Sequence, residues 1–187
     1  MARAGAGFDA VLLGACGLAL TLSLAMLLPL AAHASGPTPP GFVLQPWKGS
    51  RPVPMLPLQD LDGTPWRLAD QRGRAVLLNF WASWCEPCRA EMPALQQLAD
   101  THRGGLMVLT INLKESEASV RQFVQRTGLR LPVVRDADGA LARAWGVSVY
   151  PSTALIDARG RVQAVVVGEV DWMGPDGQRL LRPLQAD

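Results

Sequence analysis

The sequence predicts an α/β fold for the part of the chain that follows residue 52. Two continuous apolar runs, Ala75–Trp81 and Leu106–Leu113, are typical of strands that a sheet buries on both faces. Between them lies a stretch whose apolar residues recur at helical spacing, which makes a β–α–β unit. A hairpin and a closing helix follow toward the C-terminus, so strands and helices alternate along the chain.

Length and composition agree with one packed domain. The chain has 187 residues, of which 49% are hydrophobic, which is enough for a core of ordinary size. The formal net charge is only +2 and the basic residues are scattered, so we expect no nucleic-acid partner. The 3 cysteines are too few for a four-thiolate zinc or iron–sulfur site.

The first 34 residues are predicted to be a signal peptide or a membrane anchor. The stretch from Ala10 to Ala32 carries no charge and is long enough to cross a bilayer as a helix. Ala32-His33-Ala34 has the small-residue pattern of a signal-peptidase site, and Pro29 favours cleavage, but an uncleaved anchor remains open. Cys16 lies in this apolar stretch and is interpreted as a small apolar residue.

Residues 35–52 are predicted to be a linker, and residues 53–187 the folded domain. Proline and glycine interrupt the linker at nearly every third position, which favours an extended tether. Its apolar residues could still dock on the domain surface; they are Phe42, Val43, Leu44 and Trp47.

Turn and helix signals predict the remaining elements of the domain. Asp62-Gly63 is a hairpin turn between strands at Met55–Leu61 and Thr64–Leu68. The helix that follows Cys85 has Met92 on its apolar face, and Pro93 lies inside it. The other expected elements are helices at Ser116–Thr127, Asp138–Trp145 and near Asp176–Leu184, and strands at Leu131–Arg135, Thr153–Asp157 and Val162–Val167.

Cys85 and Cys88 stand where the strongest predicted strand gives way to a helix. The first helical turn has unpaired N–H groups and a partial positive charge, which stabilise a thiolate placed there. Two cysteines three residues apart can close a small disulfide, with the first as the exposed nucleophile and the second as the resolving thiol. Pro87 suits an early helical position because its missing N–H costs little there.

A C-x-x-C pair has other uses in proteins. A zinc half-site would need two more ligands, and the only histidines are His33 and His102. A c-type haem attachment needs a histidine where Arg89 stands. A purely structural disulfide remains an alternative, although it explains neither the strand-to-helix position nor the flanking Trp81 and Trp84.

The segment LLNFWASWCEPCRAEMP, residues 77–93, resembles the thioredoxin superfamily, and more narrowly its exported TlpA/ResA/CcmG-type thiol–disulfide oxidoreductases. Further similar segments are residues 58–63, residues 111–113 with Glu115-Ser116, and residues 146–153. The resemblance implies a thioredoxin-like fold, with a central mixed sheet flanked by helices, an N-terminal hairpin and a central insertion.

In that family the segment like residues 146–153 holds a cis-proline that faces the C-x-x-C pair. The resemblance therefore implies a cis Tyr150–Pro151 bond, with an ordinary trans proline as the alternative. The backbone of Tyr150 would be presented to a substrate strand that lies across Cys85. The residues expected to contact substrate are Trp84, Glu86, Pro87 and Tyr150, with Glu86 exposed beside the thiolate.

Asn79 and Glu91 bear on proton transfer at the pair. Asn79 occupies the strand position where cytoplasmic thioredoxins usually carry a buried acid, and an amide cannot transfer a proton as a carboxyl group can. The resemblance implies an active-site glutamate at Glu91, which we expect to handle the proton of Cys88. The alternative is a solvated charge on the helix surface.

The resemblance implies an enzyme: a periplasmic protein-disulfide reductase, soluble after signal cleavage or anchored to the inner membrane. Its clients would be apocytochrome c or copper-site assembly proteins, and a membrane thiol donor of the DsbD/CcdA type would reduce it again. A loose resemblance of residues 168–172 to the TlpA-type ending points toward oxidase assembly. We expect no cofactor beyond the Cys85–Cys88 disulfide, no metal, and a monomer.

Two alternative functions come from other classes of protein. A peroxiredoxin-like peroxidase would carry a P-x-x-x-T-x-x-C pattern, whereas Ser83-Trp84 precedes Cys85 here. A copper-binding assembly chaperone usually has three residues between its cysteines and a histidine near the position of Pro151. This chain has a two-residue spacing and no histidine after His102.

Overall fold

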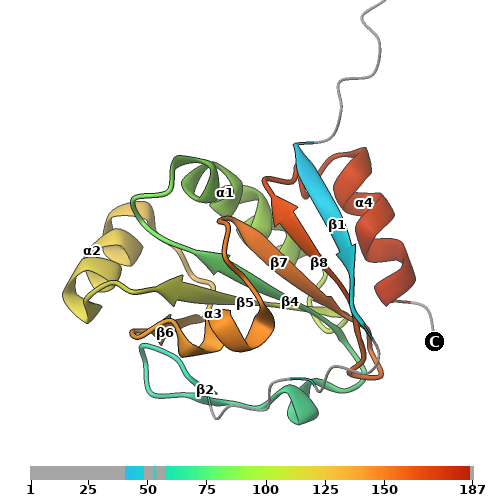
Figure 1. Ribbon diagram of the computed structural model, residues 1–187, viewed down its shortest axis with the longest axis horizontal. Coiled ribbons are helices and arrows are strands. Elements are labelled where there is room, and N and C mark those ends of the chain that lie inside the picture. The colour runs from blue at the N-terminus through green and yellow to red at the C-terminus, as the bar shows by residue number, and fades with distance from the viewer. Residues whose placement is uncertain (1–40, 49–52, 54–57, 186–187) are drawn as a thin grey trace, which may run out of the picture. The chain divides into compact units, whose positions relative to one another are not determined.

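A six-stranded mixed sheet forms the centre of the protein, in the strand order β1-β8-β7-β4-β5-β6 (Figure 1). The computed structural model describes residues 41–48, 53 and 58–185. The strands of the sheet are β1 (Phe42–Pro46), β4 (Ala75–Trp81), β5 (Leu106–Leu113), β6 (Val133–Asp136), β7 (Ser152–Ile156) and β8 (Val162–Gly168). A separate hairpin is made by β2 (Leu58–Gln59) and β3 (Pro65–Trp66).

Helices cover both faces of this sheet, which confirms the predicted thioredoxin-like fold. The helices are α1 (Glu86–Thr101), α2 (Glu117–Thr127), α3 (Ala140–Trp145) and α4 (Pro175–Leu181), with short 3₁₀ turns η1 (Leu68–Gln71) and η2 (Arg182–Leu184). The core on one face contains buried residues of α1, α2 and α4, and the core on the other face contains those of α3. The β2–β3 hairpin packs on the α3 side through Leu58 and Trp66.

Strand alternation decides which residues of β4 face the redox helix. β4 pairs in parallel with β5 and antiparallel with β7, and every residue in it is buried. Leu77 and Trp81 belong to the core beneath α1, whereas Leu78 and Phe80 belong to the opposite core. Because side chains alternate along a strand, Asn79 points to the same face as Leu77 and Trp81, toward α1.

The linker predicted for residues 35–52 is wrong for its middle part. Phe42–Pro46 forms the edge strand β1, which pairs antiparallel with Gly168–Ala164 of β8. Phe42 packs against the core. The strand also pairs with backbone N–H and C=O groups of β8 that would otherwise lie unpaired at the sheet edge. Prolines that interrupt a central strand are tolerated at an edge, which is why a proline-rich segment can still be a strand here.

The other elements agree with the predicted ones, with shifts at their ends. The two central strands match residue for residue. β2 ends at Gln59 and β3 at Trp66, both short of the predicted ends Leu61 and Leu68, and residues 55–57 lie outside the described residues. The η1 turn was not predicted. The signal peptide or anchor at residues 1–34, with Cys16, lies outside the described residues. Among the residues that are described, no helix is both long and apolar enough to cross a membrane.

Gly168 ends β8 in a backbone conformation that suits glycine, with φ 111°. A Cβ atom there would lie 2.4 Å from the Gly41 carbonyl oxygen and 2.9 Å from the Phe42 Cα. We expect Gly168→Ala to lower the free energy of unfolding by at least about 2 kcal/mol in urea denaturation, because backbone atoms must move. Gly73→Ala is the control, since φ is 93° there but no atom lies within 4 Å; an equal loss in both variants would contradict the steric explanation.

Candidate active site

A disulfide joins Cys85 and Cys88 at the N-terminus of α1. Cys85 is the N-cap residue of the helix, in extended conformation, and its Sγ accepts the N–H of Cys88 at 3.3 Å. Cys85 keeps 7% of its surface exposed, whereas Cys88 is fully buried at 0%. The pair therefore lies where the sequence places it, and the first cysteine is the one a partner can reach.

The local sequence favours a helix start at this point. Pro87 stands in the first turn, where no intrahelical partner is lost, and Glu86 places a negative charge at the positive end of the helix. Glu86 is largely exposed and pairs with Arg89 at 3.0 Å, as expected for a residue on the rim of the site. The same helix terminus would stabilise a Cys85 thiolate in the reduced protein.

The loop before the pair is held by an acid that the sequence reasoning did not single out. Glu115 accepts the backbone N–H of Ser83 at 2.7 Å and the Ser83 hydroxyl at 2.5 Å. Asn112, near the end of β5, donates to the same carboxylate at 2.7 Å. Glu115 lies two residues after the end of β5, which pairs with β4, and its signals in the sequence were that position and its place in a segment similar to the family.

The Tyr150–Pro151 peptide is cis, which confirms the prediction and removes the trans alternative. The carbonyl of Pro151 accepts the N–H of Gly168 at 2.9 Å, which ties the loop to the end of β8. The Ser152 hydroxyl donates to the Val149 carbonyl at 2.8 Å. Both hydrogen bonds hold the loop at the start of β7.

Aromatic side chains connect the cis-proline loop to the redox pair. The rings of Trp84 and Tyr150 meet edge to face with centroids 6.3 Å apart, so the loop lies beside the residue that precedes Cys85. Trp84 is 67% exposed and Val149 is 53% exposed, which is unusual for large apolar side chains. This apolar surface beside Cys85 fits the predicted contacts of Trp84 and Tyr150 with substrate, which remain predictions.

Glu91 is buried beneath the redox pair, so the alternative of a solvated surface charge is wrong. It lies one helical turn after Cys88 on the buried face of α1 and is only 3% exposed. Its Oε1 accepts from the Asn79 amide at 2.6 Å, and its Oε2 accepts from the Trp172 indole N–H at 3.2 Å. Asn79 also donates to the Thr153 hydroxyl at 3.1 Å, which connects the acid to β7.

The surroundings of Glu91 raise its pKa to about 7, from an ordinary value of 4.5. Burial is the main cause, because it penalises the charged carboxylate. Hydrogen bonds from Asn79, Trp172 and the Val170 backbone lower the pKa but do not offset burial. A carboxyl group with a pKa near neutrality can both accept and return a proton under physiological conditions.

Residues 50–165 match the AhpC/TSA family. The chain belongs to this family. It is 38% identical over 138 residues to the thiol-disulfide oxidoreductase ResA of Geobacillus thermodenitrificans, covering 73% of this chain and 71% of the relative. The ResA of Bacillus subtilis is 36% identical over 133 residues, covering 70% and 74%.

Solved structures of similar proteins share this fold. A putative thiol:disulfide interchange protein DsbE from Chlorobium tepidum superposes with a TM-score of 0.65 at 28% identity, covering 71% of this chain and 94% of that one. A secreted thiol-disulfide isomerase from Corynebacterium glutamicum gives 0.65 at 28% identity, covering 81% and 96%. The relatives and the Cys85–Cys88 disulfide together make this member of the AhpC/TSA family a thiol–disulfide oxidoreductase, as the sequence predicts.

Proposed function

We propose that this oxidoreductase works in the periplasm as a reductase of disulfides in client proteins. The observation that carries the proposal is the unequal burial of the two cysteines at the start of α1. Cys85 retains 7% of its residue surface and Cys88 retains 0%, so the first cysteine is the one nearer to a client. The second sulfur is placed to attack from within and release the client.

The reduced protein would act in two steps. The Cys85 thiolate attacks one sulfur of the client disulfide, the client S–S bond breaks, and the leaving client thiolate takes up a proton. Glu91 then accepts the proton of Cys88, directly or through water, and the Cys88 thiolate attacks Cys85 Sγ. The second client thiolate leaves, and two electrons have passed from the dithiol to the client. The product is the Cys85–Cys88 disulfide of this structure.

The protein must then be reduced again by a thiol donor, and outside the cytoplasm we infer a membrane donor of the DsbD/CcdA type. An exported location is supported by the similar protein from Corynebacterium glutamicum, which is a secreted one. Clients would be apocytochrome c or copper-site assembly proteins. None of the relatives described above is named as a peroxidase or a copper chaperone, so we propose neither alternative.

Trapping tests the proposed order of attack. The Cys88→Ser variant should stall as a mixed disulfide between Cys85 and its client, which is recovered under non-reducing conditions and identified by mass spectrometry. Cys85→Ser is the control and should capture nothing, because the remaining thiol is buried. If neither variant captures a protein from periplasmic extracts, the proposal is overturned in favour of a structural disulfide. Recovery of apocytochrome c or a copper-site protein would identify the pathway.

A further inference from the structure

The hydrogen bonds that described residues make to Glu91 are all donated to its carboxyl group. Asn79 Nδ2 donates to Oε1 at 2.6 Å, the Trp172 indole N–H donates to Oε2 at 3.2 Å, and the backbone N–H of Val170 is a third donor. This set suits the ionised carboxylate, which only accepts hydrogen bonds. A protonated Glu91 carries an O–H that needs an acceptor, and none of these three nitrogens can accept.

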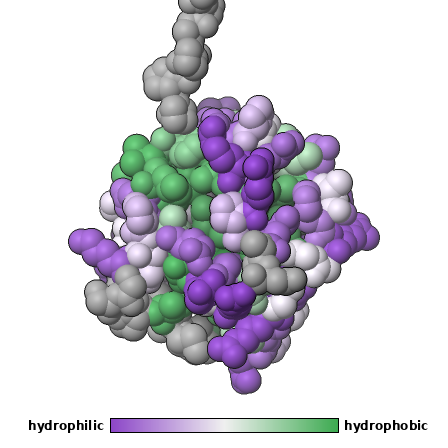
Figure 2. Space-filling view, turned by 90° about the vertical axis from the view of Figure 1, so that its right-hand side faces the viewer, coloured by the Kyte–Doolittle hydropathy of each residue, from purple (hydrophilic) through white to green (hydrophobic). Residues whose placement is uncertain are grey.

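The site of this proton lies in the core of the protein. Glu91 is buried, as are Asn79 and Trp172. Trp172 shares its core with Leu180 and Leu181 of α4, the helix on the side of the molecule that Figure 2 shows. An O–H without an acceptor is costly in such surroundings, so the acid form of Glu91 needs a partner.

The Asn79 amide also carries an acceptor atom, unlike the other two donor groups. Its oxygen, Oδ1, is buried and has no hydrogen-bond partner among the described residues. The indole N–H of Trp172 and the backbone N–H of Val170 can only donate. A half turn of the amide about its Cβ–Cγ bond would put Oδ1 where Nδ2 now lies, within reach of Glu91 Oε1.

The second neighbour of Asn79 allows the same half turn. Asn79 Nδ2 also donates to the hydroxyl of Thr153 at 3.1 Å, on β7 two residues after Pro151. A hydroxyl both accepts and donates, so Thr153 can donate to Oδ1 once the amide has turned. Both contacts of the Asn79 amide are therefore kept, with their directions reversed.

We propose that Asn79 is a positioning residue that serves both protonation states of Glu91 by turning its amide. Nδ2 faces the ionised carboxylate, as in this structure, and Oδ1 faces the protonated form and accepts its O–H. The inference rests on the proposed function, in which Glu91 takes the proton of Cys88. In that step the S–H bond breaks, an O–H bond forms on Glu91, and the Cys88 sulfur keeps the electron pair. The turned amide then holds the acid form until the proton passes on.

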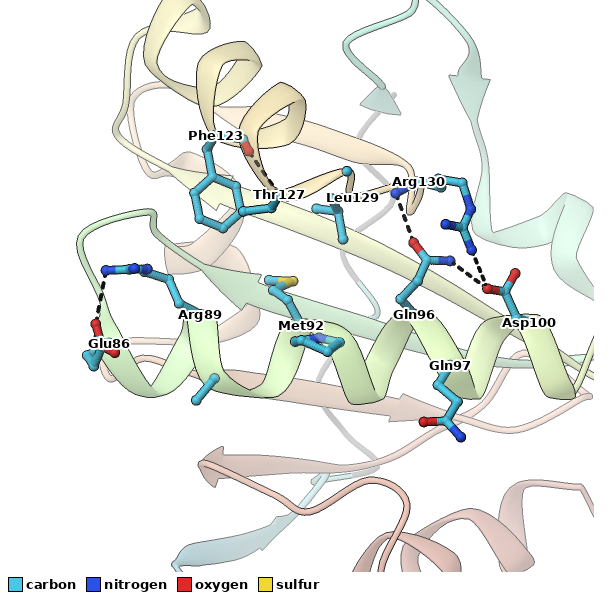
Figure 3. A pocket seen from close by; sticks show the side chains of 13 residues that line it. Glu86, Arg89, Met92, Gln96, Gln97, Asp100, Phe123, Thr127, Leu129 and Arg130 are labelled. Carbon is cyan, nitrogen blue, oxygen red and sulfur yellow. Dashed lines mark hydrogen bonds and ion pairs between the residues drawn. The ribbon is translucent and has the colours of Figure 1, made fainter.

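The charged groups around this network leave Glu91 as the group whose titration would turn the amide. Glu169, in the segment after β8, raises the pKa of Glu91, while β4 and β7 contribute an uncharged amide and hydroxyl. The other charged residues of α1 and α4 are exposed or half-buried: Glu86, Arg89, Asp100, Asp176 and Arg179. Figure 3 shows those of α1 along the groove between this helix and the end of α2. The Cys85–Cys88 disulfide does not titrate.

Nuclear magnetic resonance makes the turn directly visible. The chain has only two asparagines, Asn79 and Asn112, so full-length oxidised protein labelled with ¹⁵N-asparagine gives two side-chain NH₂ signals. The measurement is the NOE between the Asn79 NH₂ protons and the side chain of Thr153, from about pH 8 to about pH 5. We expect this NOE at high pH and its loss as Glu91 takes up a proton. Asn112, whose amide donates to Glu115, is the internal control and should keep its NOEs.

Two substitutions separate this role from that of a simple donor. Trp172→Phe removes a group that stabilises only the ionised acid, so the pKa of Glu91 should rise. Asn79→Leu removes a donor to one form and an acceptor for the other, so the pKa of Glu91 should rise less than in Trp172→Phe. The pKa is followed through the ¹³C signal of the Glu91 carboxyl group.

The outcomes separate this inference from the proposed function. An Asn79 amide that keeps its NOE to Thr153 while Glu91 titrates would overturn the inference, because the proton would then have another acceptor such as bound water. A larger rise in the pKa of Glu91 from Asn79→Leu than from Trp172→Phe would also overturn it, by making Asn79 a donor only. The proposed function fails on a different result, when Cys88→Ser captures no client protein.

Discussion

The Cys85→Ser variant should lose disulfide reduction by at least about a thousandfold, the order expected when a covalent nucleophile is removed. Cys85 is the only residue of the pair that retains exposed surface, and Cys88 at 0% exposure cannot replace it. A serine hydroxyl at the same helix terminus does not ionise near neutral pH. The measurement is the rate at which dithiothreitol reduces insulin in the presence of each variant.

The matched control for this loss is Cys88→Ser, which leaves the nucleophile in place. It should fail in multiple turnover and yet react once, leaving client bound to Cys85. Unfolding curves for both variants, compared with that of the reduced parent, show whether the fold survives. A Cys85→Ser protein that still reduces insulin at a rate near that of the parent would refute the assignment of the nucleophile.

The free energy of unfolding of the oxidised protein should fall as the pH rises from acid toward neutrality, and Glu91 is the reason. The pKa of this group is about 7 in the folded chain against 4.5 as its ordinary value. Between these two values the folded chain holds a proton that the unfolded chain has lost, so each rise in pH costs stability. The loss is complete above about pH 7 and amounts to about 3 kcal/mol.

Glu91→Gln tests this directly, because an amide does not titrate. We expect the free energy of unfolding in urea to drop with pH between about 4.5 and 7 in the parent protein, and to lose that drop in the variant. A variant with the same pH slope as the parent would show that another group is responsible. Glu86→Gln is the control: it removes an exposed carboxylate from the same helix.

The same variant addresses proton transfer at the redox pair. If Glu91 accepts the proton of Cys88, the pH dependence of thiol alkylation in the reduced protein should change in Glu91→Gln. An Asp100→Asn control should change it much less, because that carboxylate lies near the other end of α1. Identical alkylation profiles for Glu91→Gln and the parent would leave Glu91 with a structural role only.

The core strands and the redox pair were predictable because their signals are local. A seven-residue apolar run such as Ala75–Trp81 is stable mainly where both faces of the strand are buried in a sheet. The cis peptide before Pro151 was also predicted, but from the resemblance to a family and not from any pattern in the residues. Local residue patterns thus predicted the strands and the redox pair, whereas the resemblance to a family predicted the cis peptide.

Contacts between segments far apart in the chain could not be predicted from the sequence. β1 was taken for a linker because its partner, β8, lies more than a hundred residues further along and nothing in FVLQP reveals an open sheet edge. The bond between Glu115 and Ser83 and that between Glu91 and Trp172 span 32 and 81 residues. Such pairings depend on how strands and helices stack, which single-chain periodicity does not encode.

The indole of Trp172 lies against the buried acid, and this gives the protein an optical reporter of its own. The indole N–H donates to Glu91 Oε2, so ionisation of that carboxyl creates a charge within hydrogen-bond distance of a fluorophore. Emission that shifts with pH in the parent and not in Trp172→Phe would follow a single titration without any label. A residue of the C-terminal segment, far from the cysteines in sequence, thereby reports the protonation state of Glu91 through its fluorescence.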